Sequence, residues 1–272
     1  MEFKLPKREE FSHKGTFGRV LNIAGSDNYT GAAYLSSVSA LKTGCGLVSL
    51  CSSNKVISAV SNLSPDITFT PLTELKNKIE EFDVISIGCG LSTETAQTVL
   101  FKSVLSALQD KQTPLVIDAD GLNILAKLKK PVLPENTVIT PHPKEASRLL
   151  KTDVKKILDK PVDYTKKLAV KYNCTAILKL HSTVVCSKDM EIYINDTGNS
   201  ALAKAGSGDV LTGILSGLLA QNMNPFEAAK LAVYLHGKTG EIASSMLTEY
   251  STLASDLIKY IPLAIQVILD ED

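Results

Sequence analysis

Short apolar runs alternate with amphipathic stretches along the first half of the chain. The runs are rich in Val, Ile and Leu, several end in Gly, Asp or Ser, and they occupy residues 20–24, 47–51, 84–87, 115–118 and 137–140. This length and composition predict buried strands. Between them, Tyr34, Val38 and Leu41 recur at i, i+4 and i+7, which predicts a helix over residues 32–41, and residues 93–108 favour another. The alternation predicts a mostly parallel sheet with helices on both faces.

The pattern changes in the second half of the chain. Three apolar runs follow one another closely, at residues 175–180, 183–187 and 191–195. This spacing suits hairpins rather than crossovers, so we expect a short antiparallel edge. Helices are expected near residues 209–221, 225–247 and 251–268. Because no low-complexity linker and no solenoid repeat interrupts the sequence, we expect one α/β domain over residues 1–272.

Charge and composition exclude several classes of protein. The 29 basic residues balance 29 acidic ones, which argues against a nucleic-acid-binding protein. No apolar run approaches the roughly 20 residues of a membrane span, and the start lacks an apolar signal region. The five cysteines are odd in number and scattered, so neither a disulfide framework nor a zinc site is expected. We expect a cytoplasmic protein without a membrane partner.

Polar and glycine-rich turns follow four of the predicted strands. They are residues 25–27, 88–90, 118–120 and 140–143. Each could be ordinary turn chemistry. Ligands of open α/β sheets bind beyond the carboxyl ends of the strands, however, and four such turns at equivalent positions favour a shared site.

A glycine-rich motif, Ala205-Gly-Ser-Gly-Asp209, stands directly before a predicted helix. Small residues allow a ligand to approach the backbone, and free amides at a helix start bind anions. Asp209 could accept the proton of a substrate hydroxyl in phosphoryl transfer. A helix with packing glycines and a first-turn Asp explains the motif equally well. The Walker A loop and the dinucleotide fingerprint are both absent.

Other polar residues carry weaker signals. His142 is held between two prolines and precedes Glu145, yet an ordinary loop His before a helix would look the same. Lys179 could meet a phosphate or simply extend from a strand end. Asp118 and Asp120 could hold Mg²⁺ through water or form a strand-end turn.

Taken in order, several blocks resemble the ADP/ATP-dependent NAD(P)H-hydrate dehydratases, a family of the ribokinase-like superfamily. The matching blocks cover about residues 11–240 and lie at residues 13–20, 25–33, 87–91, 118–123, 140–145, 198–199 and 205–213. The resemblance implies a single ribokinase-like domain that uses ADP, or ATP, with Mg²⁺ to repair hydrated NADH and NADPH. The hydrate hydroxyl would be phosphorylated and phosphate then lost, releasing AMP when ADP is used. The resemblance also implies a homotetramer.

The resemblance also implies roles for individual residues. Asp209 would be the catalytic base, and the Gly206, Ser207 and Gly208 amides would stabilise the transferring phosphate. The hydrated nicotinamide nucleotide would contact Ala33, Gly90, Asn123, His142 and Asp209. The adenine nucleotide would contact Lys179, Leu180, His181, Ser182, Thr183 and Gly208. No metal ligands are assigned.

This sequence departs from the family pattern at three positions. Cys89 replaces a usual Pro, and Lys144 and Leu180 each replace a usual Gly. Leu180 lies inside the expected nucleotide segment and puts the nucleotide contacts of that segment in doubt.

Two alternatives stay open: a small-molecule kinase of the same superfamily, acting on a hydroxymethylpyrimidine, thiazole or sugar, and a catalytically silent nucleotide-binding or scaffold protein. The ADP choice rests only on the compact, bacterial-type chain.

Overall fold

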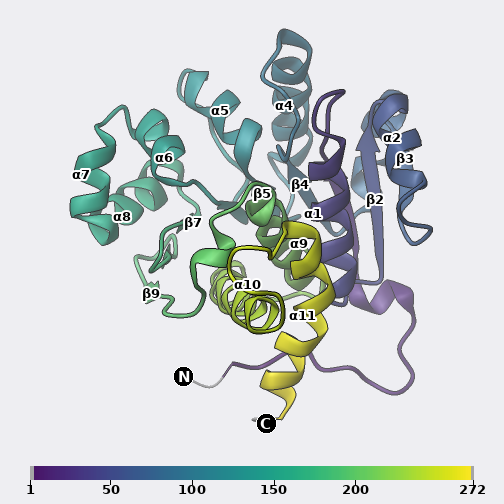
Figure 1. Ribbon diagram of the computed structural model, residues 1–272. Helices are drawn as coiled ribbons and strands as arrows, with labels where there is room; N and C mark the ends of the chain where they lie inside the picture. Colours follow the sequence, from purple (N-terminus) through teal and green to yellow (C-terminus); the bar gives the residue numbers. More distant parts are fainter. Residues whose placement is uncertain (1–2, 271–272) are drawn as a thin grey trace.

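One nine-stranded sheet forms the centre of the molecule in the computed structural model, which describes residues 3–270 (Figure 1). The strand order is β3-β2-β1-β4-β5-β6-β7-β8-β9; the neighbours from β3 to β7 pair in parallel, and β8 and β9 add in antiparallel fashion. The strands are β1 Arg19–Ile23, β2 Leu47–Ser52, β3 Thr68–Pro71, β4 Val84–Ile87, β5 Leu115–Ile117, β6 Thr137–Ile139, β7 Thr175–Leu178, β8 Val184–Cys186 and β9 Ile192–Ile194. The predicted parallel sheet and its antiparallel edge are both confirmed.

Helices cover both faces of this sheet. One face carries α1 Thr30–Lys42, α2 Asn54–Ser61, α9 Ser207–Ala220, α10 Pro225–Leu247 and α11 Ala254–Leu269. The other carries α3 Leu75–Lys78, α4 Thr95–Leu108, α5 Ala119–Lys127, α6 Pro143–Leu150, α7 Val154–Asp159 and α8 Pro161–Tyr172. Short 3₁₀ turns lie at Lys14–Phe17, Leu72–Glu74, Ile79–Glu81 and Ser200–Leu202. This is the layered α/β arrangement that the alternation predicted.

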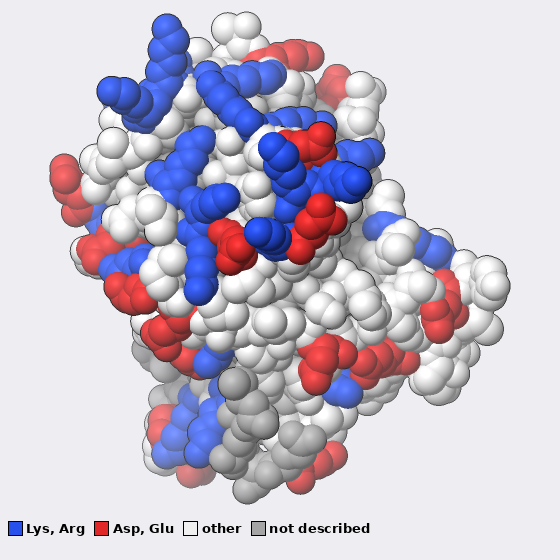
Figure 2. Space-filling model, turned by 90° about the vertical axis from the view of Figure 1, so that its left-hand side faces the viewer, with Lys and Arg blue, Asp and Glu red and all other residues white. Residues whose placement is uncertain are grey.

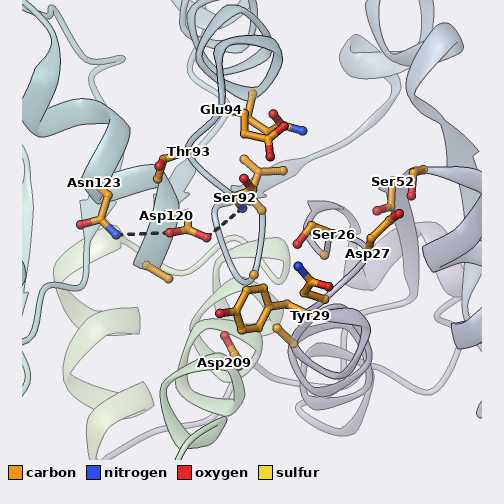
Figure 3. A pocket seen from close by; sticks show the side chains of 18 of the residues that line it. Ser26, Asp27, Tyr29, Ser52, Ser92, Thr93, Glu94, Asp120, Asn123 and Asp209 are labelled. Carbon is orange, nitrogen blue, oxygen red and sulfur yellow. Dashed lines mark hydrogen bonds between the residues drawn. The ribbon is translucent and has the colours of Figure 1, made fainter.

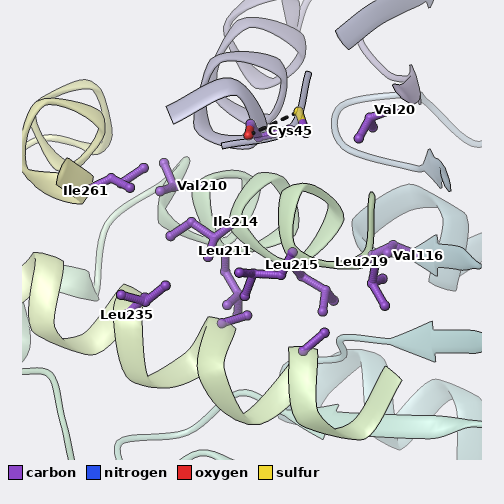
Figure 4. Close-up of a cluster of buried hydrophobic side chains, with 14 of the residues drawn as sticks. Val20, Cys45, Val116, Val210, Leu211, Ile214, Leu215, Leu219, Leu235 and Ile261 are labelled. Atoms are coloured by element: carbon purple, nitrogen blue, oxygen red, sulfur yellow. Dashed lines mark hydrogen bonds between the residues drawn. The ribbon is translucent and has the colours of Figure 1, made fainter. Parts of the chain in front are cut away.

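Side chains of each central strand alternate between two buried clusters. In β1, Val20 packs in the cluster beneath α9 and α10, whereas Leu21 and Ile23 pack in the cluster beneath α4 and α5. Figure 4 shows part of the first cluster, where the side chain of Leu215 lies between α9 and α10. Since both faces are covered, the strands are apolar on both sides, which explains their continuous apolar runs.

The contact between α1 and α9 is unusually close and depends on glycine. A Cβ on Gly213 would lie 2.3 Å from the carbonyl oxygen of Ser36, and one on Gly217 would lie 2.6 Å from that of Ala40. The predicted helix over residues 32–41 is confirmed, but its periodic residues Tyr34 and Leu41 are only half-buried. Small residues take the deepest positions because the backbones approach so closely.

Some elements were not visible in the sequence pattern. Strand β3 and helices α2, α3, α5, α7 and α8 were missed, and the predicted strand at 175–180 ends at Leu178. These elements are short or lie within mixed polar sequence, where periodicity is weak. All five cysteines are free and buried. Among the described residues, no helix combines the length and the apolar character that crossing a bilayer requires.

Candidate functional site

The sheet has a topological switch point between β1 and β4. The chain leaves β1 toward β2 on one side, while β4 begins the series that runs to β7 on the other. The loops that follow β1 and β4 meet there, and the Gly25 amide donates a hydrogen bond to the carbonyl of Cys89 at 2.8 Å. Gly25 and Gly90 have φ angles of +83° and +61°, a region that favours glycine. Such a crevice is the usual ligand site of an open α/β sheet.

A pocket of about 760 Å³ opens at this crevice, and we call it the switch-point pocket (Figure 3). Of the residues expected to contact substrate, Gly90, Asn123 and Asp209 line it. Ala33 is fully buried and does not line it; its Cβ would lie 2.9 Å from a Cβ placed on Gly25. The other residues that line the switch-point pocket include Ser26, Asp27, Asn28, Tyr29, Ser52, Ser53, Ser92, Thr93, Glu94, Gln97, Asp120 and Glu145.

A second pocket, of about 740 Å³, lies beside the turn between β7 and β8, and we call it the β7–β8 pocket. Of the residues expected to contact the adenine nucleotide, Lys179, Leu180, His181, Thr183 and Gly208 line it. Ser182, in the same turn, is exposed and is not part of the wall.

His142 also lines the β7–β8 pocket and not the switch-point pocket. Its Nε2 nevertheless lies 3.4 Å from Oε1 of Glu145, a residue in the wall of the switch-point pocket. Its place in the substrate set stays a prediction.

The first turn of α9 separates the two pockets. Gly206, at φ +91°, caps the helix and lines the switch-point pocket with Asp209, whereas Ser207 and Gly208 line the β7–β8 pocket. The first hydrogen bond within α9 runs from the Val210 amide to the Gly206 carbonyl. The amides of Gly208 and Asp209 therefore have no acceptor within the helix and are free to bind an anion. The Ser207 hydroxyl lies 3.0 Å from Nε2 of His236. The glycine-rich motif is thus positioned as an anion site between two cavities.

A buried ion pair lies beside this turn. Nζ of Lys179 is 2.7 Å from Oδ1 of Asp118, and the Thr212 hydroxyl donates to Oδ2 at 2.8 Å. Burial alone would raise the pKa of Asp118, but the Lys179 ammonium and these hydrogen bonds bring it below its usual range. Burial opposes the charge of Lys179 too, yet Asp118 raises its pKa. Both groups are therefore charged at neutral pH.

Two further carboxyl groups in the switch-point pocket have pKa values raised well above the ordinary range of a carboxyl group. Burial, followed by the charge of Asp118, raises the pKa of Asp209 to about 7. Burial is also the main reason that the pKa of Glu145 rises to about 7. A carboxyl with a pKa near the working pH is well matched to accept a proton.

His142 caps α6. Its Nδ1 accepts the amide hydrogen of Lys144 at 3.1 Å, and Oε2 of Glu145 accepts the His142 amide hydrogen at 2.8 Å. Burial, followed by the charge of Lys179, lowers the pKa of His142 to about 4. The imidazole is therefore neutral at physiological pH.

Among the described residues, one group of side chains has metal-ligand spacing. Ligand atoms of Cys89, Asp118 and Asp209 all lie within 4.8 Å of one another. Burial raises the pKa of the Cys89 thiol well above its usual value, which leaves a neutral sulfur and a poor zinc ligand. Carboxylate oxygens suit a hard cation that keeps waters and phosphate oxygens as its other ligands.

Thr212 and His236 were missed from the sequence. Thr212 follows Asp209 by three residues on the same helix, a spacing that places both on one face and could have identified it. His236 lies within the long helix α10, and nothing in the local sequence distinguishes it from a packed core histidine. Only the fold brings it to Ser207.

The fold and site together define a ribokinase-like α/β protein. A ribokinase-like superfamily protein from Enterococcus faecalis is similar in structure, with a TM-score of 0.88 and 29% identity, covering 97% of this chain and 92% of the other. The fold expected from the resemblance is therefore confirmed.

Residues 20–263 match the sequence profile of the NAD(P)H-hydrate dehydratases, and the chain belongs to this family. The ADP-dependent (S)-NAD(P)H-hydrate dehydratase of Neisseria meningitidis is 37% identical, over 92% of this chain and 84% of that protein. A crystal structure of the ADP/ATP-dependent NAD(P)H-hydrate dehydratase from Bacillus subtilis, co-crystallised with ATP/Mg²⁺, has a TM-score of 0.87 and 31% identity. The match covers 97% of this chain and 94% of the chain of the Bacillus subtilis protein. The family expected from the sequence blocks is confirmed.

The family also includes longer proteins. The chain spans about half the length of the bifunctional NAD(P)H-hydrate repair enzymes that it matches. It spans most of the length of the single-function relatives.

Proposed function

We propose that this protein catalyses the ADP-dependent dehydration of (S)-NAD(P)H hydrate to NAD(P)H, with release of AMP and phosphate. The observation that carries the proposal is the position of Asp209. Its carboxyl group lies in the first turn of α9, where free amides can bind a phosphate, and this turn stands between two pockets large enough for separate ligands.

We assign the hydrated dinucleotide to the switch-point pocket and ADP to the β7–β8 pocket. Lys179 and Gly208 in the second pocket offer an ammonium group and a helix-start amide to phosphate oxygens. Asp209 in the first pocket faces the hydroxyl that must be phosphorylated. His142 lies in the wall of the nucleotide pocket, and we propose that it reaches the hydrate from that side.

The residues of the chain supply two contributions to the reaction. Asp209 accepts the hydroxyl proton as the substrate oxygen bonds to the β-phosphorus of ADP and the bond from that phosphorus to AMP breaks. The amides at the start of α9 hold the charge that develops on the transferring phosphoryl group. The ring nitrogen of the substrate then expels phosphate as the C–O bond breaks, and proton loss from the neighbouring carbon restores the double bond.

Mg²⁺ fits the charges of the site. The carboxyl groups of Asp118, Glu145 and Asp209 converge near one ammonium group, that of Lys179, so a bound nucleotide phosphate would bring its negative charge into a site where carboxyl groups outnumber cations. A divalent cation held by these carboxylates and by phosphate oxygens would offset that charge. When bound, it supplies electrostatic stabilisation of the phosphate groups.

The three departures from the family pattern have different consequences. Cys89 is buried beside Asp209, so it contacts the proposed base directly. Lys144 is exposed on α6, outside both pockets. Leu180 contributes to the β7–β8 turn through its backbone, because its amide donates a hydrogen bond to Thr183 Oγ1 at 3.2 Å. We propose that the β7–β8 turn binds the nucleotide through this framework despite the larger side chain. A homotetramer and a cytoplasmic location are further predictions.

The direct test is turnover of hydrated NADPH and hydrated NADH, with ADP and ATP compared side by side in the presence of Mg²⁺. The dihydropyridine absorbance should recover. When ADP is the co-substrate, AMP and phosphate should form in equal amounts. If the protein turns over neither hydrate but phosphorylates a hydroxymethylpyrimidine, a thiazole or a sugar, it is a kinase of the same superfamily. If it binds ADP and catalyses neither reaction, the scaffold interpretation is correct.

A further inference from the structure

A third hollow, of about 570 Å³, adjoins the switch-point pocket on the side of α5 and α6. It shares Thr93, Asp120 and Asn123 with that pocket. Its remaining walls are Ala126, Lys127, Arg148 and Lys151, and we call it the cationic hollow. The three basic residues come from the last turn of α5 and the end of α6, which pack side by side. A ligand in the switch-point pocket can therefore extend into a space with three positive side chains.

The positive charges of the hollow are not neutralised within the described part of the chain. Lys127, Arg148 and Lys151 form none of the ion pairs found there. Arg148 donates a hydrogen bond to Oδ1 of Asn123 at 2.9 Å, which fixes its guanidinium group beside the shared wall. The nearby Asp120 already accepts hydrogen bonds from the Ser92 amide at 2.8 Å and from Asn123 at 3.2 Å.

The opposite end of the switch-point pocket has balanced charge. Figure 3 shows Asp27 and Ser52 on one side of the pocket, with Asp120 and Asn123 on the other. On the side of Asp27 and Ser52, Nζ of Lys55 forms an ion pair with Oδ2 of Asp27 at 3.2 Å. An anionic group of a bound ligand is therefore attracted to the α5–α6 end.

The surface around the hollow strengthens this attraction. Residues 127–171 contain 12 Lys or Arg and five Asp or Glu, although the whole chain is neutral. Figure 2 shows basic side chains gathered on the upper part of this face of the molecule. A local excess of positive charge raises the local concentration of an anionic ligand and speeds its association.

We infer that the cationic hollow binds the extra phosphate group that distinguishes hydrated NADPH from hydrated NADH. The inference rests on the proposed function and goes beyond it by naming the preferred substrate. A guanidinium group binds phosphate through two parallel hydrogen bonds, and ammonium groups add charge without fixed geometry. Basic residues at helix ends also complement the helix dipoles. That role does not explain why Arg148 is tethered to Asn123, a residue of the shared wall.

The test compares kcat/KM for the two hydrates, with ADP and Mg²⁺ at saturation. One variant combines Lys127→Gln with Lys151→Asn; Asn is chosen because Lys151 has a φ of +52°, which Asn tolerates. A second variant is Arg148→Gln. The matched control is Lys155→Gln, which removes an exposed cation of α7 that lines neither cavity. Wild type should prefer hydrated NADPH, and each test variant should reduce the preference by about tenfold or more, which corresponds to about 1.4 kcal/mol.

Three results would overturn the inference: no preference in wild type, an unchanged preference in both test variants, or an equal loss for both hydrates. Equal loss would mean that the hollow attracts anions in general. Thermal unfolding of each variant should match wild type, which separates binding from folding.

Calorimetry with NADP⁺ and NAD⁺ keeps this test separate from the test of the proposed function. If wild type turns over neither hydrate, the proposed function fails. The hollow is still supported if wild type binds NADP⁺ more tightly than NAD⁺ and the test variants lose that difference. If wild type turns over neither hydrate and binds NADP⁺ and NAD⁺ with equal affinity, the inference about the cationic hollow is overturned.

Discussion

Nζ of Lys179 lies 2.7 Å from Oδ1 of Asp118, and the ion pair stands directly beside Gly208 in the first turn of α9. The pair joins the end of β7 to the end of β5, so the two loops that flank the anion site keep a fixed spacing. A phosphate group that binds at α9 as proposed would therefore meet an ammonium group that is already oriented.

Lys179→Met should destabilise the protein by about 3–5 kcal/mol, because it leaves the Asp118 carboxylate buried without its partner. ADP affinity should fall as well. Urea unfolding and calorimetry measure the two effects. The double variant with Asp118→Asn removes the unpaired charge and should regain much of the stability but not the ADP affinity. Recovery of both would show that Lys179 has a structural role only.

Asp209→Asn should reduce turnover by roughly 10²–10⁴-fold, the usual contribution of a positioned general base. The amide has nearly the same size as the carboxyl group but cannot accept the proton. Single-turnover kinetics with hydrated NADPH measures the loss. Near-normal turnover would contradict the assignment of Asp209.

The same variant should become more stable than wild type above about pH 7. Burial raises the pKa of Asp209 from 3.8 to about 7, so ionisation costs more in the folded state than in the unfolded state. This cost is absent below pH 3.8, grows as the pH rises to about 7 and is then constant. Removing it should stabilise the free protein by on the order of 1–3 kcal/mol, less any loss of favourable helix-dipole interaction. Urea unfolding at about pH 4 and about pH 8 tests the trend, and an equal difference at both would contradict it.

Gly208→Val should weaken ADP binding while the fold is kept. A Cβ at this position would lie 3.4 Å from Nζ of Lys179, so Ala fits with a small adjustment whereas a branched side chain reaches into the phosphate path. Gly208→Ala is the matched control. Calorimetry should show a large loss of ADP affinity for Val and a small one for Ala. Unaltered affinity for both would support a packing role for this glycine.

His142→Ala tests which ligand the imidazole contacts. Loss of one hydrogen bond costs about 0.5–1.5 kcal/mol net, and it should appear only for the ligand that the residue touches. If His142 contacts the hydrate, as predicted, KM for hydrated NADPH rises and ADP affinity is kept. A loss confined to ADP would place it in the nucleotide site, in line with its position in the pocket wall. Equal loss for both would indicate that the residue acts through its cap on α6.

Local patterns were sufficient to predict every strand of the described sheet except β3, but not all of the site. The apolar runs that became β1, β4 and β5 are buried on both faces, so burial and sequence carry the same signal. Asp209 was predicted because it belongs to a contiguous glycine motif. His236 could not be predicted, because it meets Ser207 only after α10 packs on α9.

The sequence pattern also did not predict which residues of α1 are the most deeply buried. Close contact with Gly213 and Gly217 selects Ser and Ala for the deepest positions, which a search for large apolar residues passes over. The sequence likewise did not indicate that Ala33 would lie beneath Gly25 instead of in the pocket wall.

The first turn of α9 lines both pockets, and two ligands bound there as proposed would be thermodynamically linked. A molecule in either cavity contacts the same few peptide units, so the charge and order that one ligand imposes on that turn change the affinity of the other. Linkage requires the effect to be reciprocal: if ADP alters the dissociation constant of the hydrate by some factor, the hydrate alters that of ADP by the same factor. If the two ligands bind as proposed, the shared turn makes the availability of one a determinant of the protein's apparent affinity for the other.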